Sequence, residues 1–161
     1  MSEKPNRRWI WFFAVLTGLT VAAIATLIIY NTRQQLRPPD LEAARQRWQA
    51  QGPADYNLEY SVAKQSSERE LFTVRVRQGH VEAVALNGRP LEPAQYHYYG
   101  IPALFDFIEE FLDQDAQPGK PRTFTKALFD DNDGHVTHYV RRVMGSRERV
   151  EINLRLDRVG G

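Results

Sequence analysis

The feature that most constrains this chain is an uninterrupted apolar run near its N-terminus, from Trp9 to Tyr30. The run contains no charged residue. As an α-helix it would be about 33 Å long, close to the hydrocarbon thickness of a bilayer. A helix satisfies its own backbone hydrogen bonds, so it is the form that a lone span takes in lipid. Aromatic residues suited to the headgroup region lie at both ends: Trp9, Trp11, Phe12, Phe13 and Tyr30. The sequence therefore predicts one transmembrane helix over residues 9–30.

A cleaved signal peptide is the main alternative to an uncleaved anchor. Lys4, Arg7 and Arg8 would form its positive N-terminal region, and residues 23–25 resemble a small-residue cleavage site. However, the apolar run continues through residues 26–30, whereas the apolar part of a secretory signal is usually about 7–15 residues long. The length therefore favours retention of the helix in the membrane.

The charges on the two sides of the run bear on its orientation. The nearest cations precede it, and a long C-terminal domain can cross the membrane whatever its charge. We therefore expect residues 1–8 to be a cytoplasmic tail and the main domain to lie outside. This corresponds to a single-pass protein of the bacterial inner membrane with a periplasmic or extracellular domain. Counted more widely, cations after the run nearly balance the tail: Arg33, Arg37, Arg45 and Arg47.

Small residues recur every four positions within the predicted span. Such spacing allows another helix to approach closely, which indicates packing against other transmembrane helices. The alternative is that small residues are simply common in membrane helices. The residues concerned are Ala14, Gly18, Ala22 and Thr26.

Composition limits what the rest of the chain can do. We expect residues 31–39 to form a stalk, because Pro38 and Pro39 favour extended backbone, and residues 40–161 to form one soluble domain. The net charge of the 161-residue chain is +1 and it has no cysteine. These values argue against a nucleic-acid partner and exclude disulfides, thiol chemistry and a lipid-modified cysteine.

Hydrophobic periodicity predicts an α+β fold for the soluble domain. Apolar residues at helical spacing indicate helices over 41–51, with Asp40 as the N-cap, and over 100–113. Alternating apolar and polar residues indicate strands. The order α-β-β-β-α-β-β-β favours a small antiparallel sheet with the two helices packed on one face. The predicted strands are 56–62, 72–77, 80–86, 123–129, 136–143 and 150–156.

Residues 41–157 resemble a bacterial domain-of-unknown-function family, family 6174. The resemblance is carried by Ala44 and Trp48, by Tyr56 and Tyr60, by a hairpin with Val74, Val76, Gly79 and Val81, by Leu104, Phe105, Asp106 and Ile108, and by Phe129, Asp130 and Gly134. It implies a membrane-anchored or lipoprotein extracytoplasmic domain. This chain departs from the pattern at His135 and lacks the lipoprotein cysteine. No site residue is implied by the family.

The acidic segment 130–134 is the candidate for metal chemistry, with Asp131 and Asp133 as its ligands. Oxygen-rich loops bind calcium, but an EF-hand aligned on Gly134 would place Phe129 and Val140 at ligand positions. A hairpin turn is the alternative, because Asp, Asn and Gly tolerate the left-handed backbone of turns. His135 and His138 are three residues apart on an expected strand, so they should point to opposite faces.

Two surface groups are candidates for contact with a partner. Tyr96, Tyr98 and Tyr99 combine apolar area with hydroxyl groups, and they could equally close one end of the core. Arg141 and Arg149 belong to a basic C-terminal hairpin, which suits an anionic lipid or an acidic partner. The alternative for this hairpin is a sheet face kept soluble by its charges.

These observations favour a single-pass, membrane-anchored binding or assembly module that is not an enzyme. It could be an accessory subunit of a membrane protein complex. The expected partners are the lipid bilayer and other transmembrane helices, with no cofactor and no catalytic residue. The alternative is a metal-dependent or hydrolase-like extracytoplasmic enzyme that uses Asp130, Asp131, Asp133 and His135. No phosphate loop, nucleophile elbow or zinc-protease motif is present in the sequence.

Overall fold

The computed structural model describes residues 7–33, 35–65 and 68–159. The chain divides into two compact units, Met1–Gln35 and Leu36–Gly161. The first unit holds one long helix, α1 (Arg7–Arg33). Within the described residues, no helix meets the combined requirement of length and apolar character for crossing a membrane. Lys4, in the predicted cytoplasmic tail, lies outside the described residues.

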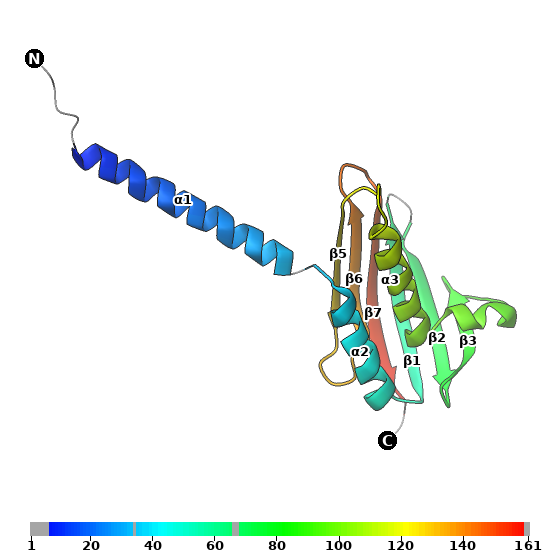
Figure 1. The fold of residues 1–161 in the computed structure, drawn as a ribbon. Helices are drawn as coiled ribbons and strands as arrows, with labels where there is room; N and C mark the ends of the chain where they lie inside the picture. The colour runs from blue at the N-terminus through cyan, green and yellow to red at the C-terminus, as the bar shows by residue number, and fades with distance from the viewer. Residues whose placement is uncertain (1–6, 34, 66–67, 160–161) are drawn as a thin grey trace, which may run out of the picture. The chain divides into compact units, whose positions relative to one another are not determined.

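The second unit is built on one antiparallel sheet, as predicted. Its strand order is β4-β3-β2-β1-β7-β6-β5, so the first and last long strands pair at its centre (Figure 1). Each of its hairpins joins neighbours in sequence, and only the β1–β7 pair joins distant segments. The strands are β1 (Tyr56–Lys64), β2 (Glu70–Arg77), β3 (His80–Leu86), β4 (Arg89–Pro90), β5 (Thr123–Phe129), β6 (Val136–Val143) and β7 (Arg149–Arg158).

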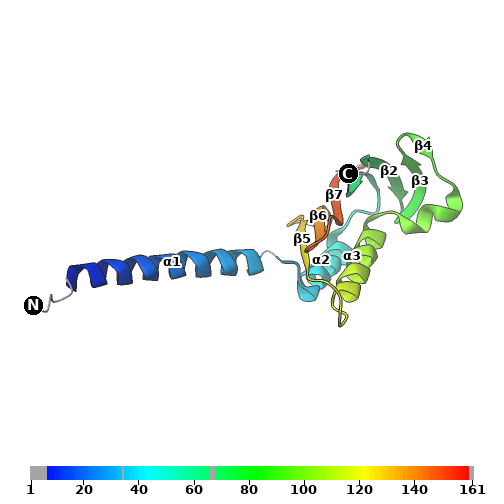
Figure 2. The same ribbon diagram turned by 90° about the horizontal axis from the view of Figure 1, so that it is seen from above.

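Two helices, α2 (Pro38–Gln51) and α3 (Ile101–Asp115), cover the same face of this sheet, as both views show (Figures 1 and 2). Their apolar sides pack on the alternate apolar positions of the strands. Buried side chains on the helices include Leu41, Ala44 and Trp48 from α2 and Ile101, Leu104, Phe105 and Ile108 from α3. This arrangement confirms the predicted α+β class with both helices on one side.

The segment predicted as a stalk, residues 31–39, overlaps the second unit, which begins at Leu36. Leu36 is buried, and its backbone N–H donates to the carbonyl of Thr125 on β5. Pro38 and Pro39 begin α2, because the first turn of a helix needs no N–H donor from them. Asp40 is therefore not the N-cap: it lies in the first turn, and its carboxylate accepts the backbone N–H of Arg37. The apolar side chain of Leu36 draws this segment into the core.

Two short elements were not predicted from the sequence. Strand β4 has two residues and a 3-10 helix, η1, covers Pro93–Tyr98. Both follow the turn at Asn87 and Gly88, where both residues have a positive φ. Neither element is long enough to show a hydrophobic period, so periodicity could not reveal them.

Candidate functional site

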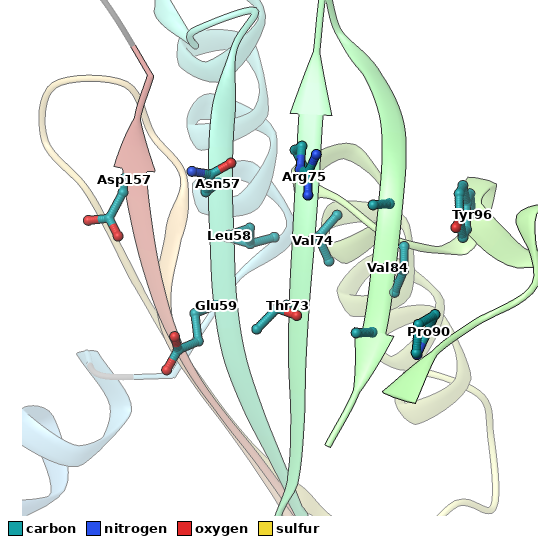
Figure 3. Close-up of a pocket in the computed structure, with 12 residues that line it drawn as sticks. Asn57, Leu58, Glu59, Thr73, Val74, Arg75, Val84, Pro90, Tyr96 and Asp157 are labelled. Carbon is teal, nitrogen blue, oxygen red and sulfur yellow. The ribbon is translucent and has the colours of Figure 1, made fainter. Parts of the chain in front are cut away.

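The face of the sheet that the helices leave uncovered carries a hollow. On β1, Tyr56, Leu58 and Tyr60 are buried, while Asn57 and Glu59 between them are exposed on the other side. We call the side away from α2 and α3 the open face. The hollow there has a volume of about 450 Å³. Its lining residues come from β1, β2, β3, β4, β7 and η1 (Figure 3). Its polar and aromatic lining includes Asn57, Glu59, Thr73, Arg75, Tyr96 and Asp157.

Three of these polar side chains make no hydrogen bond or ion pair within the described residues: Glu59, Thr73 and Arg75. The other two are held by neighbours. Asn57 accepts a 3.0 Å hydrogen bond from Arg77, and Asp157 pairs with Arg155 at 3.2 Å. A polar group without a partner in the protein can contact a ligand without breaking a contact in the protein. The hollow therefore has the character of a binding surface, with both signs of charge available.

The tyrosine cluster does not form one contact patch. Tyr96 lines the hollow on the open face, and Figure 3 shows it beside Pro90 at the β4 side. The ring of Tyr99 packs against Phe72, with 5.6 Å between centroids, on the side that the helices cover. Tyr98 is 70% exposed. Tyr96 and Tyr99 together line a second hollow of about 390 Å³ beside η1. Of the three tyrosines, only Tyr96 also lines the hollow on the open face.

The acidic segment forms the turn between β5 and β6, which confirms the hairpin interpretation. The carboxylate of Asp130 accepts the backbone N–H groups of Asn132 and Asp133, at 2.8 and 3.3 Å. Gly134 adopts a φ of +80° and lies directly against α2, where a Cβ atom would come within 2.4 Å of the carbonyl oxygen of Ala44. Only glycine combines this φ with such a close approach.

The three groups that could hold a metal ion in this turn are Asp130, Asp133 and His135, whose ligand atoms lie within 4.8 Å of one another. Asp131, the other predicted ligand, is exposed and is not part of this cluster. Asp133 is 1% exposed, and both its oxygens have partners. One accepts the backbone N–H of His135 and contacts the His135 ring, and the other accepts from Arg158 at 2.9 Å. The carboxylate that is best placed for a metal is already used to hold the turn.

The electrostatics of Asp133 agree with this structural role. Burial by itself would raise the pKa of the Asp133 carboxyl. Hydrogen bonds from the backbone and ring of His135, with a further one from Arg158, outweigh burial and hold the pKa below its usual range. The ring of His135 packs edge-on against Trp48 of α2 at 6.3 Å. The turn, the end of β7 and α2 are thereby joined around one ionised carboxylate.

The two histidines near this turn have separate partners, although His135 precedes β6 and the alternation of a strand does not apply to it. His135 contacts Asp133 and lies before β6, and its side chain is nearly buried. His138 lies on the open face, where its Nδ1 is 2.8 Å from the amide oxygen of Asn153.

Arg141 and Arg149, the predicted basic contacts, differ in accessibility. The guanidinium of Arg141 is 8% exposed. It forms two hydrogen bonds to Asp115 of α3, a third to Glu148, and lies 4.5 Å from the centre of the Phe111 ring. The difference in accessibility has a simple reason: side chains alternate along β6, so Arg141 faces α3 and its neighbour Arg142 faces outward. Arg149 is on the open face and pairs with Glu151.

In the first unit, Ala14, Gly18, Ala22 and Thr26 all lie on the helix α1. Each has an exposed side chain or, at Gly18, open space around the Cα atom. The hydroxyl of Thr26 donates to the carbonyl of Ala22 within the same helix, at 2.8 Å. These four small residues are therefore accessible on α1. Exposed large apolar side chains, such as Phe13 and Leu19, lie next to them in the sequence.

The residues of the hollow were missed at the level of sequence. Asn57, Glu59, Thr73, Arg75 and Asp157 are the polar members of strands whose apolar members were used to predict the core. The signal that could have found them is the same alternation of apolar and polar residues along each strand. What the sequence did not show is that β7 pairs with β1, which brings Asp157 opposite Asn57.

The fold and this hollow define a class: a small α+β domain with one helix-covered face and one polar open face. Residues 40–119 match the model of the family of unknown function (DUF6174), and the chain belongs to this family. The match runs from α2 through α3, so it is shorter than the predicted resemblance over 41–157 and leaves β5 to β7 beyond it. No curated protein and no solved structure is similar enough to match this chain.

Proposed function

We propose that this protein is a non-catalytic binding module, anchored in the bacterial inner membrane by its N-terminal helix, and that the open face is its binding surface. The observation that carries the proposal is the hollow of about 450 Å³ on that face. It presents Glu59, Thr73 and Arg75 without partners in the described residues. In contrast, the acidic turn uses its carboxylates to complete the fold, which gives hydrolytic or metal chemistry less support.

The anchor is supported by the character of α1. Many of its described side chains are large, apolar and exposed, and water is a poor environment for such a surface. They include Trp9 at 62%, Trp11 at 66%, Phe12 at 63% and Leu19 at 65% exposure. With the uncharged run from Trp9 to Tyr30, these side chains suit a lipid environment. We place the N-terminal tail in the cytoplasm and the globular unit in the periplasm or at the cell exterior.

The proposal includes a role as an accessory subunit of a membrane protein complex. The small residues of α1 would meet another transmembrane helix at Gly18. Co-purification in mild detergent tests this part: Gly18→Leu should reduce the recovery of companion proteins, whereas Leu19→Ile should not. A clean monomer that is unaltered by Gly18→Leu would contradict assembly through α1.

The anchor itself is tested by alkaline extraction of membranes from cells that produce the full chain. We expect the full-length chain to stay in the membrane pellet. A shorter, soluble product would instead indicate a cleaved signal peptide, and a full-length soluble chain would contradict the anchor altogether.

The binding surface is tested by thiol labelling, because the chain has no cysteine of its own. Thr73→Cys places a thiol in the hollow, and Ala43→Cys places one on the exposed side of α2. In native membranes we expect Thr73→Cys to react several-fold more slowly with a polar thiol reagent than it does in detergent. Ala43→Cys should react equally in both, and equal behaviour of the two variants would contradict a binding role for the open face.

A further inference from the structure

The two sides of the globular unit carry opposite charge. Helices α2 and α3 together contain seven carboxylates and two guanidinium groups. The open face of β1, β2, β5, β6 and β7 carries six cations and three carboxylates, assigned by strand alternation and register. The cations are Arg75, Arg77, Lys126, Arg142, Arg149 and Arg155, and the carboxylates are Glu59, Glu151 and Asp157.

We infer that the open face docks on the surface of an anionic lipid bilayer, a conclusion that rests on the proposed membrane anchor. Cations that lie on one flat face can approach a negatively charged surface together, and each contributes to the attraction within a Debye length. The acidic helices would be repelled by the same surface. The charge distribution therefore selects which side of the unit faces the lipid.

The pairing of the cations leaves some of them available for lipid headgroups. Arg77 donates to Asn57, and Arg149 and Arg155 pair with neighbouring carboxylates. Arg75 and Arg142 make neither a hydrogen bond nor an ion pair within the described residues. They lie on opposite sides of the β1–β7 centre of the sheet, so contact with phosphate groups at both would lay the face flat on the bilayer.

The point at which the chain enters the unit favours lipid over a soluble acidic partner. Leu36 is held against β5 by its hydrogen bond to Thr125, and α1 ends at Arg33. The tether thus joins the unit at the edge strand that contributes Lys126 to the open face. A short tether to the bilayer gives a high effective concentration of lipid at this face, which weak electrostatic contacts need in order to persist.

The test uses the full chain in nanodiscs, with a fluorophore on Thr73→Cys or on Ala43→Cys and a quencher on the lipid headgroups. With phosphatidylcholine alone we expect weak quenching at both positions. Addition of phosphatidylglycerol should increase quenching several-fold at residue 73 and leave residue 43 unchanged, and high salt should reverse the increase. Equal quenching at the two positions, or no response to phosphatidylglycerol, would overturn the inference.

Charge-reversal variants provide the matched control. Arg75→Glu with Arg142→Glu should abolish the response to phosphatidylglycerol. Arg47→Glu on α2 with Arg89→Glu on β4, whose cross-strand partner Leu86 packs against the core, should preserve it. If the fluorophore on residue 73 is quenched only when a second labelled copy is present, the open face binds another copy of the chain and the lipid inference is wrong. Failure of the chain to insert into nanodiscs at all would contradict the membrane anchor, and this outcome is distinct from a loss of the response to phosphatidylglycerol.

Discussion

The two faces of the sheet are made by the same strands and behave in opposite ways. On β1 and β2, one set of alternate residues is buried under α2 and α3, while the set between them is exposed on the open face. The covered face contains rings and branched side chains that exclude water, and the open face contains charged groups that retain it. Neighbouring residues of one strand thus have different environments, because successive side chains point to opposite sides of the sheet.

The largest contrast should come from truncating one residue on each side. Phe105 of α3 is 1% exposed, so Phe105→Ala should reduce the free energy of unfolding by about 3–5 kcal/mol. Thr73→Ala on the open face should change it by no more than about 0.5 kcal/mol. Urea denaturation of both variants measures the difference, and similar losses would show that the open face also contributes to the core.

Arg141 and Arg142 provide a sharper test, because they are adjacent in sequence and lie on opposite faces. Arg141→Met leaves Asp115 without its guanidinium partner in a nearly buried position, and should cost about 3 kcal/mol of stability. Arg142→Met should change stability by about 0.5 kcal/mol or less. Thermal unfolding of the two variants measures this difference. Equal losses of stability would contradict the assignment of Arg141 and Arg142 to opposite faces.

We expect a smaller, pH-dependent effect on stability from substitution in the acidic turn. Because the pKa of Asp133 is lower in the folded state, its stabilisation is complete above the unfolded value of about 3.9 and disappears as the pH falls through the folded-state pKa. Asp133→Asn should therefore cost about 1–3 kcal/mol at neutral pH and progressively less below about pH 4. Thermal unfolding across this pH range measures the change. Asp131→Asn, on the exposed side of the turn, is the control and should have no comparable effect.

The smallest expected effect concerns metal ions. Since the oxygens of Asp133 already have partners, calcium, magnesium or zinc should not raise the melting temperature of the full chain. A ligand that binds only the folded state raises the melting temperature by an amount that grows with the logarithm of its concentration relative to its Kd. A clear rise with zinc that Asp133→Asn abolishes would revive the metal-dependent enzyme as the better hypothesis.

Much of the fold could be predicted because alternation is a local property. The strand positions followed from residues such as Tyr56, Leu58 and Tyr60, and the amphipathic stripe of 100–113 identified α3. The sequence also identified the turn at 130–134. Its failures occurred where a residue's role depends on a distant segment: Leu36 on β5, and Arg141 on α3.

The sequence by itself determined the class of elements, their order and the apolar run of α1, because hydrophobic period and turn residues act between near neighbours in the chain. Only the tertiary structure decided that β7 pairs with β1. It thereby gathered Glu59, Thr73, Arg75 and Asp157 around one hollow and divided the charges between two sides. The physical reason is that burial is shared between segments far apart in sequence. The alternation along a strand indicates that one of its faces is covered. Which segment covers that face depends on the packing of the whole unit.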